Sequence, residues 1–400
     1  MVGDQSLDRP PLEGLVVLDL TTFLSGPFAT QLLADMGADV IKIESPQGDS
    51  SRSMPPHFID GESAYFLSHN RNKRSVVLDL KEDGQSERLR TMIAKADVVI
   101  ENFRPEVATR LGIDPTVLCE RHPSLVWASI SGFGQTGPLR DRPAYDMIVQ
   151  ALSGVMSLTG EPGRPAVRLG IPAGDVVAGM YSVIGLLALL TRVRSGGRGG
   201  QIDTSMLDGQ LTMLSYQAVY SMISGAAPQR QGARHDSIPT YRSFTGSDAR
   251  EFVVTANTER MWVGMCEALQ LQDAIADPRY GSGASRLENK ESLWELLEAR
   301  FAERSAAEWV DELVKNGVPA ALIRSVPEAL SDARESGRDM VVSVADDERG
   351  QYEAIASPIK FVGTADVPPI FPPRLGEDTE DVFRSFGVDA ALPATDTTTQ

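Results

Sequence analysis

The chain has 400 residues, 42% of them hydrophobic, which is enough for two packed domains or for one large domain with an insertion. Its formal net charge of −17 argues against a general binder of nucleic acid or of anionic membranes, since those partners favour a basic face. The two cysteines, Cys119 and Cys266, form neither a metal-spaced motif nor a disulfide framework, and no targeting segment is visible. We therefore expect a globular cytoplasmic protein without a metal site.

Short apolar runs alternate with helical segments in the first half of the chain. The runs expected to form strands are 15–20, 39–44, 75–80, 97–102 and 125–134, and helical spacing follows at 28–37 and 85–96. This alternation is typical of a parallel sheet covered by helices, so the expected fold class is α/β with a Rossmann-like sheet. A nicotinamide enzyme is not expected, because TTFLSGP follows the first strand where a G-x-G-x-x-G loop would stand. An ADP-bearing ligand at the strand ends remains compatible with such a sheet.

The segment LGIPAGDVVAGMYSVIGLLALL, residues 169–190, delivers one carboxylate, Asp175, to the start of a long apolar helix. Residues 176–190 carry no charge and are expected to be buried on all sides, and their length of 15 is short of a membrane span. Two roles are open for Asp175. It is either an N-cap that accepts hydrogen bonds from the helix, or a carboxylate held ready to act as a nucleophile.

The character of the chain changes near residue 226, where turn residues precede an expected hairpin at 245–250 and helical segments at 261–269, 293–301 and 309–315. We expect residues 1–225 to form a large Rossmann-like domain and residues 226–325 a smaller α+β domain inserted before the C-terminal segment. Residues 326–400 then return to the large domain, with a disordered tail after about residue 390.

Five segments resemble, in order, the class III CoA-transferase family, also called the CaiB/BaiF-like group. The segments are LEGLVVLDLTTFLSGPFATQLLADMGADVIKIESPQGD, NRNKRSVVLDL, ADVVIENFRPEVATRLGI, SISGFGQTGPLRDRPAYDMIVQALSGVMSLTGEPGRPAVRLGIPAGD and PPRLGEDT. The resemblance covers nearly the whole chain, and it implies that the large domain binds CoA.

The resemblance also implies that Asp175 is the catalytic residue. Its carboxylate would attack an acyl-CoA thioester and form an aspartyl–acyl mixed anhydride, and the released CoA thiolate would convert this to an aspartyl-CoA thioester. A second carboxylic acid would then take the CoA by the same steps in reverse. Glycines beside Asp175 fit this chemistry, because they let backbone N–H groups approach an oxyanion.

Further positions match the family's CoA-binding segments, and the resemblance implies contact with CoA for Asn102, Phe103, Arg110, Lys42, Asn72, Lys73 and Arg74. Cations suit the CoA phosphates. The alternatives are a strand-end turn for Asn102, a core aromatic for Phe103 and a solvated helix arginine for Arg110. Lys42 and the run from Asn72 to Arg74 would otherwise belong to an ordinary charged sheet edge.

The acceptor site is expected to include Phe23 and Leu24, which follow the first strand, together with Tyr145 and His235. His235 is either a ligand of the acceptor carboxylate or a turn histidine near the domain hinge. Arg168 is either a partner for a distal substrate carboxylate or a surface arginine. The small-domain segments resemble succinyl-CoA-using members more than the formyl-CoA transferase pattern. We therefore expect a small acid, preferably a dicarboxylate, and neither oxalate nor formate.

Two alternatives to CoA transfer are kept. The α-methylacyl-CoA racemases of the same fold family use a His/Asp pair, but the position of their histidine is Tyr145 here, and a tyrosine with a pKa near 10 is a poor base at neutral pH. The other alternative is a catalytically silent acyl-CoA-binding protein. The resemblance further implies no tightly bound cofactor, a CoA thioester as substrate, and an interlocked homodimer.

Overall fold

The structure is a computed structural model that describes residues 9–388. Its contacts divide the chain into two compact units. Unit 1 contains the residues up to Val155, Arg168–Met222 and the chain from Gly337 onward, and unit 2 contains Met156–Val167 and Ile223–Ser336. The tail predicted after about residue 390 lies outside the described residues.

These units differ from the predicted domain bounds of 226–325 in two places. Residues 156–167 belong to unit 2, where the backbone N–H of Gly232 donates to the carbonyl of Gly160 at 3.0 Å. Helix α16 (Val326–Glu335) also belongs to unit 2, where Arg250 donates to Glu328 at 2.8 Å. Both segments thus join unit 2 through contacts between residues that are distant in sequence.

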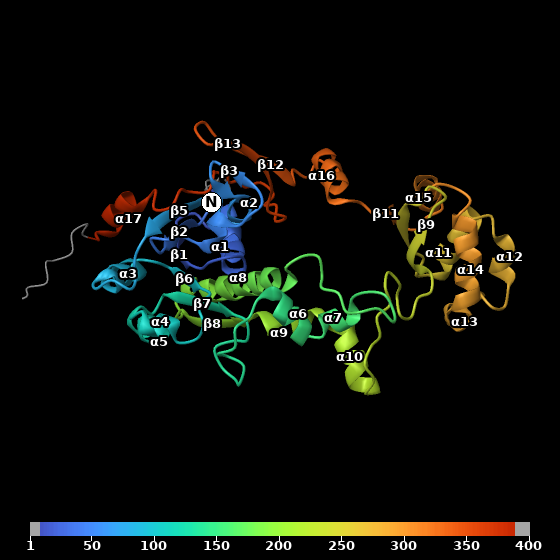
Figure 1. Ribbon diagram of the computed structural model, residues 1–400, viewed down its shortest axis with the longest axis horizontal. Helices are drawn as coiled ribbons and strands as arrows, with labels where there is room; N and C mark the ends of the chain where they lie inside the picture. The colour runs from blue at the N-terminus through green and yellow to red at the C-terminus, as the bar shows by residue number, and fades with distance from the viewer. Residues whose placement is uncertain (1–8, 389–400) are drawn as a thin grey trace, which may run out of the picture. The chain divides into compact units, whose positions relative to one another are not determined.

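A six-stranded parallel sheet forms the centre of unit 1, with the strand order β5-β2-β1-β6-β7-β8 (Figure 1). The bounds are β1 (Val16–Leu20), β2 (Asp39–Glu44), β5 (Lys73–Val77), β6 (Val98–Glu101), β7 (Val126–Ser131) and β8 (Gly200–Ser205). This confirms the α/β class with a parallel sheet. The strand order is that of doubly wound nucleotide-binding sheets and reverses between β1 and β6, so a crevice is expected beyond the carboxyl ends of these two strands.

Both faces of the sheet are covered, because neighbouring residues along each strand point to opposite sides. Val17 packs with helices α1 (Ser25–Asp35) and α8 (Ala173–Arg194) in one buried cluster. Leu18 packs with α3 (Gln85–Ile93), α5 (Pro115–Arg121) and α17 (Thr379–Phe386) in another. The remaining elements of the first 155 residues are η1 (Ser50–Ser53), β3 (Phe58–Ile59), β4 (Glu62–Ser63), α2 (Ala64–Leu67), α4 (Val107–Arg110) and α6 (Asp146–Leu152).

The C-terminal segment completes the sheet at its edge strand β5. The carboxylate of Asp378 accepts the N–H of Ser75 at 2.8 Å, and the hydroxyl of Thr379 accepts the N–H of Val77 at 3.1 Å. These contacts cover backbone groups that an exposed edge would leave open to pairing with another chain. The antiparallel pair β12 (Val341–Asp346) and β13 (Gly350–Ile355) precedes this segment.

Unit 2 contains a three-stranded antiparallel sheet and several helices. Its strands are β9 (Tyr241–Thr245), β10 (Glu251–Thr255) and β11 (Ala320–Leu322), and the β9–β10 pair confirms the hairpin predicted at 245–250. Its further helices are α11 (Glu259–Ala268), α12 (Gln272–Ala276), α13 (Gly283–Glu288), α14 (Lys290–Phe301) and α15 (Ala306–Lys315). Helices α7 (Val155–Leu158) and α10 (Ser215–Ser224) span the bounds between the units, and α9 (Met206–Met213) precedes α10 in unit 1.

Helix α8 differs from its prediction in length and in burial. It has 22 residues, so its length no longer argues against a membrane span, and by length and composition it is the one described helix able to cross a membrane. A core helix meets the same criterion, and α8 packs on α1 and on the sheet through residues such as Ala178 and Leu186. The prediction of burial on all sides is wrong, because Ile184 is 61% exposed and Met180 and Tyr181 are exposed as well.

The first turns of α1 and α8 approach each other closely at Gly179. A Cβ atom built on Gly179 would lie 2.8 Å from the carbonyl oxygen of Ser25 and 2.8 Å from a ring carbon of Phe28. A backbone oxygen cannot move aside as the end of a flexible side chain can. Gly179 is therefore required by the spacing of the two helices.

We predict that Gly179→Ala lowers the free energy of unfolding by about 1–3 kcal/mol, because overpacking outweighs the gain in helix propensity. Gly185→Ala is the matched control in the same helix, since its Cβ would meet only side-chain atoms of Ile202, the nearest at 3.2 Å. We expect the control to stay within about 1 kcal/mol of the parent. Urea unfolding of both variants measures the difference, and equal effects would contradict the role given to Gly179.

Candidate active site

A cavity of about 310 Å³ opens in unit 1 beyond the carboxyl ends of β1, β6 and β7. It therefore lies where the order of the parallel strands reverses. The residues around it come from seven segments of unit 1 and include Thr22, Phe23, Leu24, Ser25, Tyr65, Asn102, Phe103, Arg104, Arg140, Arg142, Tyr145 and Asp175.

Asp175 is the third residue of α8 and not its N-cap, which is Pro172. The N-cap alternative is therefore wrong. A carboxylate in the first turn still benefits from the positive end of the helix dipole. Asp146, the first residue of α6, supports this turn, because its Oδ1 accepts the N–H of Gly174 at 2.7 Å. Gly174 permits that approach, since a Cβ there would lie 2.9 Å from the same oxygen.

The electrostatic surroundings of Asp175 oppose its charge. Burial raises the pKa of Asp175 to about 7, the nearby Asp146 carboxylate raises it further, and hydrogen bonds from Ser25 partly offset both effects. Burial, together with the charge of Asp175, raises the pKa of Tyr65 to about 12. Tyr65 thus keeps its proton at neutral pH and presents an O–H donor to the cavity.

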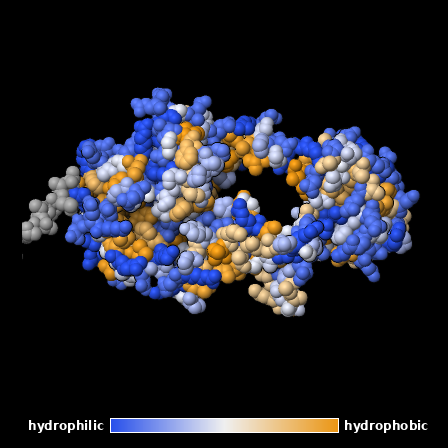
Figure 2. All heavy atoms as spheres, viewed as in Figure 1, coloured by the Kyte–Doolittle hydropathy of each residue, from blue (hydrophilic) through white to orange (hydrophobic). Residues whose placement is uncertain are grey.

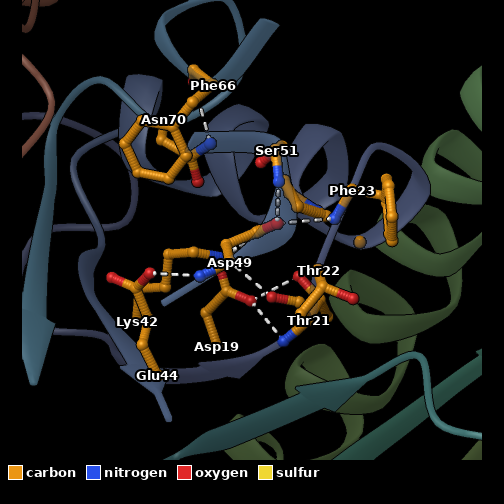
Figure 3. A network of polar contacts seen from close by, with 12 residues as sticks. Asp19, Thr21, Thr22, Phe23, Lys42, Glu44, Asp49, Ser51, Phe66 and Asn70 are labelled. Carbon is orange, nitrogen blue, oxygen red and sulfur yellow. Dashed lines mark hydrogen bonds and ion pairs between the residues drawn. The ribbon is translucent and has the colours of Figure 1, made fainter. Parts of the chain in front are cut away.

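The loop after β1 forms one wall of the cavity, and two polar side chains hold it in an uncommon conformation. Phe23 has φ of 64°, in the left-handed region that bulky residues rarely adopt. The Oδ1 of Asp49 accepts the N–H of Phe23 at 3.2 Å (Figure 3). From the other side, Asn102 accepts the N–H of Thr22 at 3.0 Å and donates to its carbonyl at 2.8 Å.

Two buried lysines contact this loop and the first turn of α1 that follows it. Lys42 donates to the carbonyl of Thr21 at 2.7 Å and pairs with Asp49 at 2.9 Å (Figure 3). Lys73 pairs with Asp19 at 3.0 Å and donates to the carbonyl of Pro27 at 3.1 Å.

The Asp19 carboxylate is the centre of this cluster. It accepts hydrogen bonds from the hydroxyls of Thr21 and Thr30 at 2.5 and 2.6 Å. Although burial raises the pKa of Asp19, the charges of Lys73 and Lys42 and these hydroxyls hold that pKa well below its usual range. Burial lowers the pKa of Lys73 to about 8, against the attraction of Asp19. Asp19 therefore stays ionised, pairs with Lys73 and is stabilised by the charge of Lys42.

These placements contradict direct contact of CoA with Lys42 and Lys73, because both side chains are fully buried and ion-paired. Asn72 and Arg74 lie elsewhere as well. Asn72 donates to Asp35 at 3.0 Å and accepts the N–H of Ile370 at 2.6 Å. Arg74 pairs with Asp39 at the amino end of β5, opposite the carboxyl end where the cavity opens. The prediction that these four residues line the CoA site therefore has no support in the structure.

A second cavity of about 250 Å³ adjoins the first and shares Thr22 and Phe103 with it. It lies beyond the carboxyl ends of β2 and β5 and is lined by Ile43, Ser45, Leu78, Asp79, Leu80 and Lys81, among others. Arg110 is exposed at the end of α4 and lines neither cavity, but its neighbour Leu111 lines the second. Phe103 thus lies at the junction of the two cavities, whereas Asn102 lines only the first.

Three of the residues predicted for the acceptor site lie around the first cavity, and two lie elsewhere. Phe23, Leu24 and Tyr145 line the first cavity, and the rings of Phe23 and Tyr145 meet edge to face with centroids 6.2 Å apart. His235 lies in unit 2, where its ring stacks on Tyr241. Arg168 is exposed, donates to the carbonyl of Leu169 at 3.2 Å, and does not line the cavity.

Several cavity residues escaped the sequence analysis, among them Ser25, Tyr65 and Arg142, as did Asp146, which supports the first turn of α8. Ser25 and, in the second cavity, Ser45 and residues 78–81 could have been suspected, because they come soon after the carboxyl ends of strands in a parallel sheet. Tyr65 comes from the four-residue helix α2, and its place beside Asp175 has no local sequence signal. Among residues 9–388, no group of three or more His, Cys, Asp or Glu side chains is arranged to hold a metal ion.

Comparison with known proteins agrees with this site. The model of the family described as CoA-transferase family III matches residues 12–379. The acetyl-CoA:oxalate CoA-transferase of Acetobacter aceti is 37% identical over 90% of this chain and 91% of that protein. The succinate–glutarate CoA-transferase of Agrobacterium fabrum is 35% identical over 94% of this chain and 95% of that protein. The crystal structure of a CaiB/BaiF family protein from Brucella suis superposes with a TM-score of 0.84 at 33% identity, covering 95% of this chain and 100% of that one.

A parallel α/β sheet with an acid at the start of a helix beside its switch-point cavity defines a CoA-binding enzyme of the CaiB/BaiF fold. The chain belongs to CoA-transferase family III, and it is a class III CoA-transferase. The resemblance found in the sequence is thereby confirmed.

We predict that Lys73→Ala lowers the free energy of unfolding by about 3–5 kcal/mol, because it leaves the buried charge of Asp19 without its partner. Arg74→Ala is the matched control one residue along, since the Arg74–Asp39 pair has side chains 34% and 41% exposed. The control is expected to cost about 0–1 kcal/mol. Urea unfolding measures both variants, and a small effect of Lys73→Ala would contradict a structural role for this lysine.

Proposed function

We propose that this chain moves CoA from an acyl-CoA donor, succinyl-CoA among the candidates, to a small carboxylic acid through covalent intermediates on Asp175. The single observation that carries the proposal is the position of Asp175, which is the one aspartate among residues 9–388 that borders the switch-point cavity. A family match over residues 12–379 supports the same chemistry.

In the proposed reaction, a carboxylate oxygen of Asp175 attacks the thioester carbonyl and expels CoA as a thiolate, leaving a mixed anhydride. The thiolate then attacks the aspartyl carbonyl, which forms an aspartyl-CoA thioester and releases the donor acid as a carboxylate. The acceptor carboxylate attacks this thioester and expels the thiolate again. The thiolate finally attacks the acceptor carbonyl, which releases the new CoA ester and restores the carboxylate of Asp175.

The lining of the cavity favours transfer over the racemase alternative. Racemisation needs two bases on opposite faces of the acyl carbon, but no histidine borders the cavity among the described residues. His69 is half-buried beside Phe28, and loss of solvation lowers the pKa of its ring to about 4. Tyr65 keeps its proton, so it acts as a donor to developing negative charge and not as a base.

The two adjoining cavities suit a long ligand that carries a reactive group at one end. We place the thioester beside Asp175 in the first cavity and the nucleotide portion of CoA in the second, where Ser45 and Lys81 are exposed. Binding beyond the carboxyl ends of the strands follows the general behaviour of open parallel sheets. Phe103, which lies at the junction, and its neighbour Asn102 in the first cavity would then contact the middle of the ligand.

Three arginines near Asp175 support an anionic acceptor. Arg104, Arg140 and Arg142 line the first cavity, and Arg140 pairs with Glu106 and Asp141. A guanidinium binds a carboxylate with two parallel hydrogen bonds, so Arg142 is suited to the distal carboxylate of a dicarboxylic acid. Glutarate and oxalate appear in the names of similar enzymes. Oxalate, which the sequence analysis disfavoured, therefore belongs in the test.

We also propose that the chain forms a homodimer and acts in the cytoplasm. Exposed apolar side chains on helices of unit 1 support the binding of a second copy of the chain. Met222 on α10 is 81% exposed, and Ile184 on α8 is 61% exposed. In Figure 2 the end of unit 1 formed by α10 carries orange and pale spheres where most of the surface is blue. Such patches are typical of interaction sites. The free cysteines Cys119 and Cys266 suit a reducing compartment.

We predict that the protein mixed with succinyl-CoA yields a CoA thioester on the peptide that carries Asp175, detected by mass spectrometry. Asp175→Asn is expected to form no adduct and to lose at least about 10³-fold in kcat, because the covalent route is closed. An acceptor panel of glutarate, mesaconate, oxalate and acetate then measures kcat/KM, and the dicarboxylates are expected to exceed acetate. Solvent deuterium entering beside the thioester carbonyl, without any adduct, would instead establish the racemase alternative. Equal behaviour of parent and Asp175→Asn would establish the silent binder.

The dimer is predicted to appear as twice the chain mass in sedimentation equilibrium. Met222→Glu should weaken it at least about tenfold in Kd, because it places a charge in an apolar interface. Val117→Glu is the control, since Val117 is 42% exposed on α5, which packs on the other face of the sheet. A parent that sediments as a monomer at every concentration would refute the dimer.

A further inference from the structure

The segment that leads into α8 has side-chain partners on another helix. Helix α6 packs against α8 and α9 (Figure 1). Two of its polar residues, Asp146 and Gln150, are four positions apart, so their side chains lie on one face of the helix. Neither residue borders the cavity of the active site, although Asp175 does. The pair is therefore placed to act on Asp175 through the backbone, without contact to the substrate.

Asp146 serves as the polar N-cap that α8 itself does not have. The N-cap residue of α8 is Pro172, whose ring cannot accept a hydrogen bond. The N–H of Gly174, the second residue of the helix, instead donates to Oδ1 of Asp146 at 2.7 Å. In most capped helices an acceptor on the N-cap residue itself satisfies this N–H or the next one. Asp146 thus fixes the turn in which Asp175 is the following residue.

Gln150 holds both Asp146 and the start of the same segment. Its side chain is fully buried. The Nε2 of Gln150 donates to Oδ2 of Asp146 at 2.6 Å, and its Oε1 accepts the N–H of Leu169 at 2.8 Å. Nε2 also lies 3.4 Å from the carbonyl oxygen of Ile171. Residues 169–174 are thereby tied to α6 at both ends of the segment.

The direction of each hydrogen bond in this arrangement is fixed by the groups that make it. The backbone N–H groups of Leu169 and Gly174 can only donate, so each requires an acceptor on α6. A carboxylate supplies acceptors alone, whereas a side-chain amide supplies both an acceptor and a donor. Two amides at positions 146 and 150 would oppose two donors, and two carboxylates would oppose two acceptors. The arrangement therefore requires one acid and one amide, in either order.

We propose that Gln150 is a positioning residue, which together with Asp146 fixes the segment that carries Asp175 and so aligns its carboxylate with the bound thioester. The inference rests on the proposed function of Asp175. Loss of the pair should slow the chemical step and leave the binding of the donor largely intact, because neither side chain borders the cavity. A misplacement of about 1 Å, caused by a substitution away from the reacting atoms, can cost about a hundredfold in rate.

The first test is the kinetics of Gln150→Met, which is close in size but cannot make these hydrogen bonds. At about pH 9, above the pKa of about 7 that burial gives Asp175, differences in ionisation contribute little. We expect kcat for succinyl-CoA to fall about tenfold to a hundredfold and KM to change less than about threefold. A change confined to KM would contradict a positioning role.

Gln31→Met is the matched control for Gln150→Met. Gln31 is a buried glutamine of α1, and its Oε1 has no hydrogen-bond partner within the described part of the chain. The substitution therefore removes a buried amide without releasing the segment before α8. Its kcat and KM should equal those of the parent.

A compensating double variant tests the pairing itself. Asp146→Asn and Gln150→Glu should each lower kcat about as much as Gln150→Met does, because each opposes two groups of the same kind. The double variant Asp146→Asn/Gln150→Glu again has one acid and one amide, so its kcat should return to within about threefold of the parent. Losses that add in the double variant would overturn the proposal. This comparison decides the matter if Gln150→Met does not fold.

Hydrogen–deuterium exchange without substrate separates failure of this inference from failure of the proposed function. The peptide that contains residues 169–175 should exchange at least about tenfold faster in Gln150→Met and in Asp146→Asn, and at the parent's rate in the double variant. A parent without transferase activity would refute the proposed function, while the exchange would still report on the pair. Unchanged exchange in both single variants, or unchanged kcat in an active enzyme, would overturn the role of Gln150.

Discussion

The buried pairing of Asp19 with Lys73, and of Lys42 with Asp49, is the constraint on which the active-site wall depends. Lys42 also donates to the carbonyl of Thr21 in the loop after β1, and Lys73 donates to the carbonyl of Pro27 in the first turn of α1, so the charges of three neighbouring strands are joined to the loop and to the helix that follows it. A buried charge is tolerated only with a partner and further hydrogen bonds. The loop is therefore held in one conformation, including the left-handed backbone of Phe23.

That loop leads directly into α1, and α1 in turn meets α8 at Gly179. The carboxylate of Asp175, the proposed nucleophile, thus lies in the first turn of a helix that Asp146 supports through the N–H of Gly174, and Ser25 at the start of α1 borders the same cavity. Burial and a neighbouring acid raise the pKa of Asp175 toward neutrality, whereas hydrogen bonds from Ser25 lower it. A nucleophile poised near the working pH combines sufficient ionisation with sufficient reactivity.

Much of the scaffold follows from local patterns. Alternating apolar runs and helical spacing predicted the strands of the parallel sheet, and the hairpin of unit 2 was predicted as well. The burial of Lys42 and Lys73 could not be predicted from local patterns. A lysine within a strand is expected at a solvated edge, and nothing local to either residue indicates that Asp19 and Asp49 meet it in the interior. Asp175 was correctly placed at the start of its helix, but in the first turn and not at the N-cap.

By itself, the sequence determined the family, the order of strands and helices, and the acid that precedes the long apolar helix. These features depend on residue type and on spacing along the chain, which determine backbone preference and the side that each residue buries. The tertiary structure alone decided which charges are buried in pairs, and that Ser25, Tyr65 and Asp146 surround Asp175. Those contacts join segments that are distant in sequence, and because burial depends on every element packed around a group, no local pattern records it.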